Sequence, residues 1–590
     1  MMRSLLIISV VATASAQGDY KWPAYRELEY ATPREIPDKI VTYALPYASL
    51  SSLVPNRTTT TWPVEATPTD HDEKFGRAAL SSLWKDIPVT TGLITTTVQP
   101  TPLPSHELVK PPPLPVYNVK RSCQSFPKNI SWGFAGSAMQ MEGALKDEGR
   151  GPSVWEARSK GQYPGEGGGP PDVAASNYYL YKQDILRLAS LGVDSYSFSI
   201  SWPRIVPFGV AGSPINQEAI DHYDDVINTI LEHGMKPVVT LQHFDTPQYF
   251  AGSSLTGLGH PEFVEGYLYY AKTVVAHYAD RVGTWYSFNE PSIEGNIDFG
   301  FGAFDVSASW NYTKNVLDAH ATLVRWYRDE VKGSGLWSFK NELSSTGFAL
   351  PLDPSSPSDV EAALRRNNFN VAMFANPIFL GKNVPESMAA AGYHVYTEEE
   401  LAFYHGTADF FAFDIYTATF HTAPEGGIEA CAQDKNHTLY PKCSVQHRNR
   451  TAMWHENFYG EIDRIAVPAD AIRPMLGYWH HTYPTKHGIT IGEFGLPIYH
   501  ASHMSIEQHV MDPAQSNFYI PFLRETLKAI NYDNVKMKGL FGWAWVDNWE
   551  WSQYRDRYGL QVFNNVTMER RFKRGIFDFA DFMLKHTSEK

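Results

Sequence analysis

Cysteine is scarce in this chain, with only three among 590 residues. So few cysteines exclude a small fold held together by disulfides, and their spacing to histidine resembles no zinc site. The sequence therefore predicts neither a metal site nor a bound cofactor. Cys431 and Cys443 flank a loop rich in Gly, Asn, Lys and Pro, and in an oxidising compartment we expect a disulfide to close that loop. Cys123 is left over.

Long apolar runs and excess positive charge are also missing. No segment after the first residues has the roughly 20 consecutive apolar residues that a membrane helix needs. Lysine and arginine total 50 against 64 aspartates and glutamates, which gives a formal charge of −14. An acidic chain argues against nucleic acid as a partner. We expect neither nucleic acid nor membrane as a partner, and the sequence does not indicate an oligomeric state.

The N-terminus has the pattern of an export signal, assigned to residues 1–16. Arg3 supplies the positive charge, residues 5–12 the apolar stretch, and Ala14-Ser-Ala16 the cleavage site, so the mature chain is expected to begin at Gln17. These features predict a secreted, extracellular protein. Six sequons are candidate glycosylation sites in a eukaryotic secretory path: Asn56, Asn129, Asn311, Asn436, Asn449 and Asn565.

Composition changes near residue 122. Residues 17–122 are rich in Pro, Thr and Ser, as in Pro111-Pro-Pro-Leu-Pro115. Such a segment buries little surface per residue, so we expect an irregular extension that is extended or wrapped over the catalytic body and dispensable for the chemistry. Residues 123–590 are interpreted as a single catalytic domain.

Within that domain, apolar runs alternate with longer stretches of helical period. This alternation is typical of βα units on a parallel sheet. Eight strands are expected, at residues 132–138, 195–200, 237–241, 285–289, 346–350, 409–416, 488–492 and 539–546. The pattern predicts an α/β fold, specifically a (β/α)₈ TIM barrel.

Two glutamates end apolar runs of this barrel pattern. Glu290 stands in Tyr286-Ser-Phe-Asn-Glu-Pro291, and Glu493 in Gly488-Ile-Thr-Ile-Gly-Glu-Phe-Gly495. Both would lie at the C-terminal ends of strands, where such barrels keep their catalytic groups. A pair of carboxyl groups is what glycoside hydrolysis needs: one protonates the leaving oxygen and the other meets the oxocarbenium-like carbon.

These blocks, in order, resemble the retaining β-glycosidases of glycoside hydrolase family 1 over residues 126–582. The Asn-Glu-Pro and Gly-Glu-Phe-Gly blocks alone would equally suit a family 5 endoglucanase. Three further blocks separate the two families: Gln140-Met-Glu-Gly143, Gln242-His-Phe-Asp-Thr-Pro-Gln248 and Asn548-Trp-Glu-Trp551.

The resemblance implies that Glu290 is the acid/base and Glu493 the nucleophile of a double displacement, with the carboxyl groups about 5–5.5 Å apart. It also implies a sugar pocket whose residues bind hydroxyl groups, stack on the ring or orient the nucleophile. These residues are Gln140, His243, Asn289, Tyr416, Trp543, Glu550 and Trp551.

The implied substrate is a small carbohydrate or glycoside. Because Glu550 would face the 4- and 6-hydroxyls and repel a phosphate, we expect a neutral β-glucoside. β-Galactosidase or β-fucosidase activity, transglycosylation, and a secreted sugar-binding pseudoenzyme on the same barrel remain alternatives.

The chain departs from the family pattern around the nucleophile. Ser197 replaces an arginine that normally pairs with the nucleophile, and Asp414 replaces an asparagine. Phe244 replaces a tryptophan, while Gly492 and Phe494 stand where threonine and asparagine are usual. An arginine beside a carboxylate lowers its pKa by about 1 to 3 units, so its loss predicts a nucleophile that is easier to protonate unless another cation or hydrogen bonds substitute.

Overall fold

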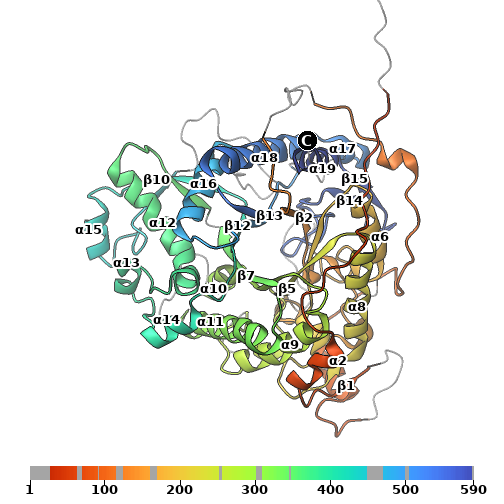
Figure 1. The fold of residues 1–590 in the computed structure, drawn as a ribbon. Helices are drawn as coiled ribbons and strands as arrows, with labels where there is room; N and C mark the ends of the chain where they lie inside the picture. Colours follow the sequence, from red (N-terminus) through yellow and green to blue (C-terminus); the bar gives the residue numbers. More distant parts are fainter. Residues whose placement is uncertain are drawn as a thin grey trace, which may run out of the picture.

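Eight parallel strands close into a barrel in the computed structural model of the chain (Figure 1). The structure describes residues 27–62, 70–90, 92–114, 124–159, 169–251, 256–299, 309–343, 347–447, 469–498 and 504–587. The barrel strands, in chain order, are β2 (Ser131–Ala135), β3 (Ser195–Ser199), β5 (Lys236–Gln242), β6 (Thr284–Asn289), β7 (Leu336–Leu343), β9 (Phe411–Ile415), β12 (Ile489–Phe494) and β13 (Met537–Trp543). The predicted (β/α)₈ fold is confirmed.

Long helices surround the barrel and cover the outward faces of its strands (Figure 1). Their apolar side chains form one continuous core with those of the strands. They are α6 (Asn177–Ala189), α8 (Gln217–Glu232), α9 (Phe263–Tyr278), α11 (Ser309–Trp326), α12 (Pro357–Ala375), α16 (Ala469–Thr482), α18 (Ala514–Asp533) and α19 (Arg574–Thr587). No helix in the described part of the chain is both long and apolar enough to cross a membrane.

Shorter elements decorate the connections. The helices are α2 (Tyr47–Leu50), α3 (Arg77–Leu83), α4 (Ala138–Met141), α5 (Val154–Ser159), α7 (Trp202–Ile205), α10 (Pro291–Phe299), α13 (Glu386–Ala390), α14 (Glu398–Tyr404), α15 (Ile428–Gln433) and α17 (Ile506–Met511). Two small sheets have two strands each: β1 (Thr59–Thr60) pairs with β4 (Ile215–Asn216), and β14 (Gln561–Phe563) pairs with β15 (Arg570–Phe572). A third sheet has three strands, in the order β11 (Val445–His447), β10 (Ala418–Thr422) and β8 (Phe348–Pro351).

The fifth barrel strand is not where the sequence predicted it. Residues 346–350 were expected to supply it, but Phe348–Pro351 forms β8, which pairs with β10 outside the barrel. The barrel strand is β7, whose sequence Leu-Trp-Ser-Phe-Lys-Asn-Glu-Leu carries two charged residues. Both charged side chains are buried, Lys340 against the carboxylate of Glu493, so the strand lacks the apolar run that marks the others.

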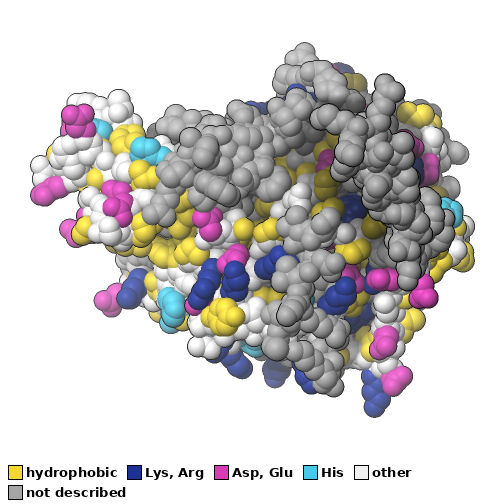
Figure 2. Space-filling model, turned by 90° about the horizontal axis from the view of Figure 1, so that it is seen from above, with side chains coloured by type: hydrophobic (Ala, Val, Ile, Leu, Met, Phe, Trp, Pro, Cys, Tyr) yellow, Lys and Arg dark blue, Asp and Glu magenta, His cyan; other side chains and the backbone are white. Residues whose placement is uncertain are grey.

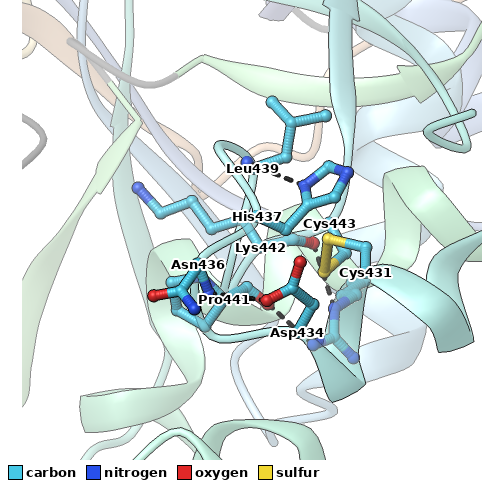
Figure 3. Close-up of a disulfide and its surroundings, with 9 residues drawn as sticks. Cys431, Asp434, Asn436, His437, Leu439, Pro441, Lys442 and Cys443 are labelled. Carbon is cyan, nitrogen blue, oxygen red and sulfur yellow. Dashed lines mark hydrogen bonds between the residues drawn. A yellow bond between two sulfur atoms is a disulfide. The ribbon is translucent and has the colours of Figure 1, made fainter.

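The loop predicted to close on a disulfide does so (Figure 3). Cys431 lies in α15 and bonds to Cys443, and both are buried. Arg365 of α12 donates hydrogen bonds to the carbonyl oxygens of Pro441 and Lys442, which ties the loop to the body of the protein. Cys123 lies outside the described residues, as does the predicted signal peptide.

The Pro/Thr/Ser-rich extension packs along the barrel's outer helices. Leu50 and Val54 join the main core, and Trp62 and Leu80 pack with Phe208. In Figure 1 this segment, red to orange, runs beside α6, α8 and α9, and α2 lies against α9. The composition did not indicate these buried anchors, because they are single apolar residues separated by turns.

Replacing one anchor should therefore destabilise the whole domain. The Trp84 side chain is buried against Ile87 and Leu145, and its Nε1 donates to the Arg150 carbonyl oxygen at 2.9 Å. We expect Trp84→Ala to cost on the order of 3 kcal/mol, seen as a lower thermal unfolding midpoint. Leu93→Ala is the control, since Leu93 is 71% exposed. Equal midpoints for the two variants would show that the extension does not stabilise the barrel.

Charges of both signs are mixed on the surface. On the face shown in Figure 2, lysine and arginine side chains lie among aspartates and glutamates. A nucleic-acid binding surface would instead gather positive charge along one face.

Candidate active site

Both predicted carboxylates lie at the C-terminal end of the barrel, where β7 and β9 separate their strands. Glu290 directly follows β6, and Glu493 is the next-to-last residue of β12. Both residues are buried, at 4% and 3% exposure. Glu290 has φ +45°, a left-handed conformation that is uncommon for a side-chain-bearing residue. Its backbone N–H donates to the carbonyl oxygen of Lys340 at 3.1 Å, which helps to hold this conformation.

Each carboxylate oxygen of Glu493 has its own hydrogen-bond donor. Lys340 Nζ lies 2.6 Å from Oε1, and the Tyr416 hydroxyl donates to Oε2 at 3.0 Å. Burial, followed by the charge of Glu493, raises the pKa of Tyr416 well above its ordinary value, so the phenol keeps its proton and remains a donor. Two donors of this kind fix the rotamer of Glu493.

Lys340 is the cation that the sequence analysis did not find. The ammonium is buried on β7, directly below the barrel opening. Burial alone would lower the pKa of Lys340, but the charges of Asp414 and Glu493 outweigh burial and raise the pKa above its ordinary value. The lysine is therefore protonated at neutral pH. The sequence predicted a more easily protonated nucleophile unless another cation or hydrogen bonds substitute for the arginine absent at Ser197, and Lys340 is that cation.

A signal for this residue was present in the sequence. Ser338, Lys340 and Glu342 alternate along β7 and so share one face of the strand. A polar row at every second position would be a poor outer face for a strand covered by helices, but it suits the interior of a barrel at its catalytic end.

The sugar-binding candidates form a connected group across the opening from β7. Glu550 accepts hydrogen bonds from Gln140 Nε2 at 3.0 Å and from Trp543 Nε1 at 2.7 Å. Gln140 Oε1 accepts in turn from the Ser137 hydroxyl at 2.7 Å. These contacts fix the orientation of the Glu550 carboxylate.

His243 and Asn289 supply neutral polar groups. The His243 ring lies parallel to Trp543, with centroids 5.8 Å apart and an interplanar angle of 19°. Burial, with a smaller contribution from the Lys340 charge, holds the pKa of His243 well below its ordinary value, so the ring is uncharged. Both amide atoms of Asn289 are buried and have no hydrogen-bond partner among the described residues. Buried polar atoms normally find partners, so Asn289 is available to a ligand.

Trp551 packs with Phe244, which stands where the family usually has tryptophan, and with Trp155. Phe244 meets Trp551 edge-on with ring centroids 5.1 Å apart, and Trp551 meets Trp155 at 5.5 Å. The substitution at Phe244 thus keeps an aromatic support behind Trp551 but removes an indole N–H from this place.

The arrangement brings the two carboxyl groups and the polar and aromatic groups of the predicted sugar pocket together. All nine predicted site residues are brought to the same end of the barrel. Among the described residues, no group of three or more His, Cys, Asp or Glu side chains is arranged to hold a metal ion.

Comparison with known proteins agrees with this geometry. Residues 122–587 match the sequence model of Glycosyl hydrolase family 1. The chain is similar to Beta-glucosidase 1B of Phanerodontia chrysosporium, with 30% identity over 75% of this chain and 83% of that protein. It is 30% identical to human Cytosolic beta-glucosidase over 74% of this chain and 92% of that protein. The crystal structure of beta-glucosidase 2 from Trichoderma reesei in complex with Tris has a TM-score of 0.70 at 29% identity, covering 79% of this chain and 100% of that one.

Proposed function

Because the chain belongs to glycosyl hydrolase family 1, we propose that it is a retaining β-glucosidase acting on terminal, non-reducing β-D-glucosyl residues. The observation that carries the proposal is the nucleophile itself. Glu493 is buried with both oxygens engaged by Lys340 and Tyr416, at the barrel end where Glu290 follows β6. A carboxylate held in this way is oriented for attack rather than for solvation.

The reaction proceeds in two displacements. Glu290 gives its proton to the glycosidic oxygen while Glu493 attacks the anomeric carbon, so the aglycone leaves as an alcohol and a glycosyl ester forms. Glu290, now a carboxylate, removes a proton from water as that water attacks the same carbon. The ester bond breaks, Glu493 is released as a carboxylate, and the anomeric configuration is retained.

The sugar is recognised by neutral donors and one fixed carboxylate. Asn289 is placed beside the acid/base for the 2-hydroxyl, where hydrogen bonds strengthen in the transition state. Glu550, fixed by Gln140 and Trp543, accepts hydrogen bonds from hydroxyl groups and repels a phosphate. The pocket therefore favours a neutral sugar over a 6-phosphosugar.

Aryl glycosides test this proposal directly. We expect turnover of aryl β-glucoside, with lower but measurable activity on β-galactoside and β-fucoside and none on 6-phospho-β-glucoside. Proton NMR of the first-formed sugar should show the β-anomer. Absence of turnover on every β-glycoside, in a protein that binds glucose, would favour the sugar-binding pseudoenzyme.

We also propose that the enzyme works outside the cell, after removal of residues 1–16. The disulfide Cys431–Cys443 suits an oxidising compartment, and five of the six sequon asparagines, Asn56, Asn129, Asn311, Asn436 and Asn565, are exposed. Asn449 lies outside the described residues. Protein secreted from a eukaryotic host should begin at Gln17 and lose mass on treatment with an amidase that removes N-glycans; a chain retained in the cells and still carrying residues 1–16 would refute secretion.

A further inference from the structure

Lys340, Asp414 and Gly492 lie against one another beside Glu493. We propose that Lys340 is the positioning residue of Glu493, and that Asp414, Gly492 and Ser197 have changed with it so that the cation comes from β7 instead of β3. The inference rests on the proposed function, because it concerns how the nucleophile of that reaction is held.

The geometry places Lys340 between two acids and in contact with both halves of the catalytic pair. Its Nζ is 2.6 Å from Glu493 Oε1 and 3.9 Å from Asp414 Oδ2. Its carbonyl oxygen accepts the backbone N–H of Glu290. Strand register sets this meeting, because Asp414 on β9 is the direct partner of Glu493 on β12, and Lys340 lies on β7 at the other side of β9.

Gly492 makes room for Lys340 and Asp414. A Cβ built at Gly492 would lie 2.5 Å from Asp414 Oδ1 and 3.0 Å from Lys340 Cδ. The register between β12 and β9 shifts between Ile491 and Glu493, so this glycine lies at the irregularity that turns Glu493 toward Asp414. The threonine usual in the family cannot occupy this position while Lys340 and Asp414 keep their places. The glycine is thus explained by the relocated charge.

Asp414 supplies a second carboxyl group beside Lys340. Both of its oxygens are buried without a hydrogen-bonding side chain among the described residues. Burial, followed by the charge of Glu493, raises the pKa of Asp414 well above its ordinary value, while Lys340 opposes the rise. In the free enzyme the ammonium lies closer to Glu493, at 2.6 Å, than to Asp414, at 3.9 Å. When Glu493 becomes a neutral ester, Asp414 is the carboxyl group left beside Lys340.

Other titratable groups surround the ammonium from every neighbouring strand. They contribute to the pH dependence of the site. These groups are Tyr286 in β6, Glu290 directly after β6, His243 after β5, Glu342 in β7 and Tyr416 after β9. None of them is a second cation, since His243 is uncharged. Removing the lysine charge therefore leaves the acids of this site without a positive neighbour among these groups.

The test compares Lys340→Met with Lys538→Met, a barrel lysine at the opposite end of β13 from the site. Without the ammonium, the carboxyl groups of this site lose the positive charge that faces them. The acid limb of kcat/KM on aryl β-glucoside should move upward by about 1 to 3 pH units. At pH values below the shifted limb, kcat/KM of Lys340→Met should be about 10- to 1,000-fold lower than that of the wild type. Lys538→Met should keep the wild-type pH profile. An unchanged acid limb in folded Lys340→Met would overturn the inference.

A relocation variant separates a positioning role from a structural one. In Lys340→Met/Asp414→Asn, addition of Ser197→Arg should return the acid limb toward the wild-type position, because the cation again approaches Glu493 from β3. If the triple variant folds and its acid limb stays displaced, the proposal that the cation has moved from β3 to β7 is contradicted. This comparison also applies if Lys340→Met alone does not fold.

Thermal stability gives a readout that does not depend on activity. In Lys340→Met, the buried acids take up protons on folding, so the unfolding midpoint should rise as pH falls from 7 to 5, relative to wild type. If no glycoside is hydrolysed by the wild type, the proposed function fails, yet this stability difference still supports or overturns the role of Lys340. Equal pH dependence in the wild type and both methionine variants would overturn it.

Discussion

Glu493→Gly is expected to lower hydrolysis of every β-glycoside by at least about 10⁴-fold, because the covalent step then has no nucleophile. The vacated space lies beside the Lys340 ammonium, which attracts a small anion. Added azide should therefore restore part of the turnover by attacking the anomeric carbon directly. A single displacement inverts that carbon, so the product should be the α-glycosyl azide.

Two outcomes would contradict this assignment. Residual hydrolysis near the wild-type rate would mean that another group is the nucleophile. A β-glycosyl azide would mean that a covalent intermediate still forms. Glu525→Gln is a suitable control, since Glu525 lies on the surface helix α18 and pairs with Lys528 there; it should keep the wild-type rate.

Glu290→Ala is expected to discriminate between leaving groups. For alkyl glycosides, which need protonation of the leaving oxygen, the loss should be about 10²- to 10⁴-fold. For an activated aryl glycoside the first step needs little protonation, so the glycosyl ester should form and then accumulate, because water has lost its general base. Rapid-mixing measurements should show a burst of phenol followed by a slow steady state.

Azide again separates the two roles. In Glu290→Ala it should attack the accumulated ester without base assistance and give the β-glycosyl azide, the opposite anomer from that of Glu493→Gly. Equal losses on alkyl and aryl substrates, with no burst, would count against Glu290 as the acid/base.

The sequence predicted the barrel and both carboxylates because these depend on local patterns. Seven strands are marked by apolar runs between helical stretches, and Glu290 and Glu493 end two of those runs. The prediction failed at β7, where the run contains Lys340 and Glu342. Burial of the Lys340 charge depends on Asp414 and Glu493 from other strands, and one strand's sequence does not reveal such partners.

The site residues also divide into those that local sequence patterns predicted and those that depend on partners from other strands. Gln140, Trp543 and Glu550 could be placed by resemblance, and their mutual hydrogen bonds follow from strand order. Ser197, Asp414 and Gly492 appeared in the sequence as unrelated departures. Asp414 and Gly492 become one feature with Lys340 only when the barrel closes and makes β7, β9 and β12 neighbours.

Lys340 also ties the acid/base to the nucleophile mechanically. Its carbonyl oxygen holds the backbone of Glu290, and its ammonium holds the side chain of Glu493, so one residue spans the two. The gap between such carboxyl groups decides whether a water fits between them, and hence whether the anomeric centre is inverted or retained. In this enzyme β7 carries neither of the two carboxylates, yet it is the strand that contacts the residues bearing both.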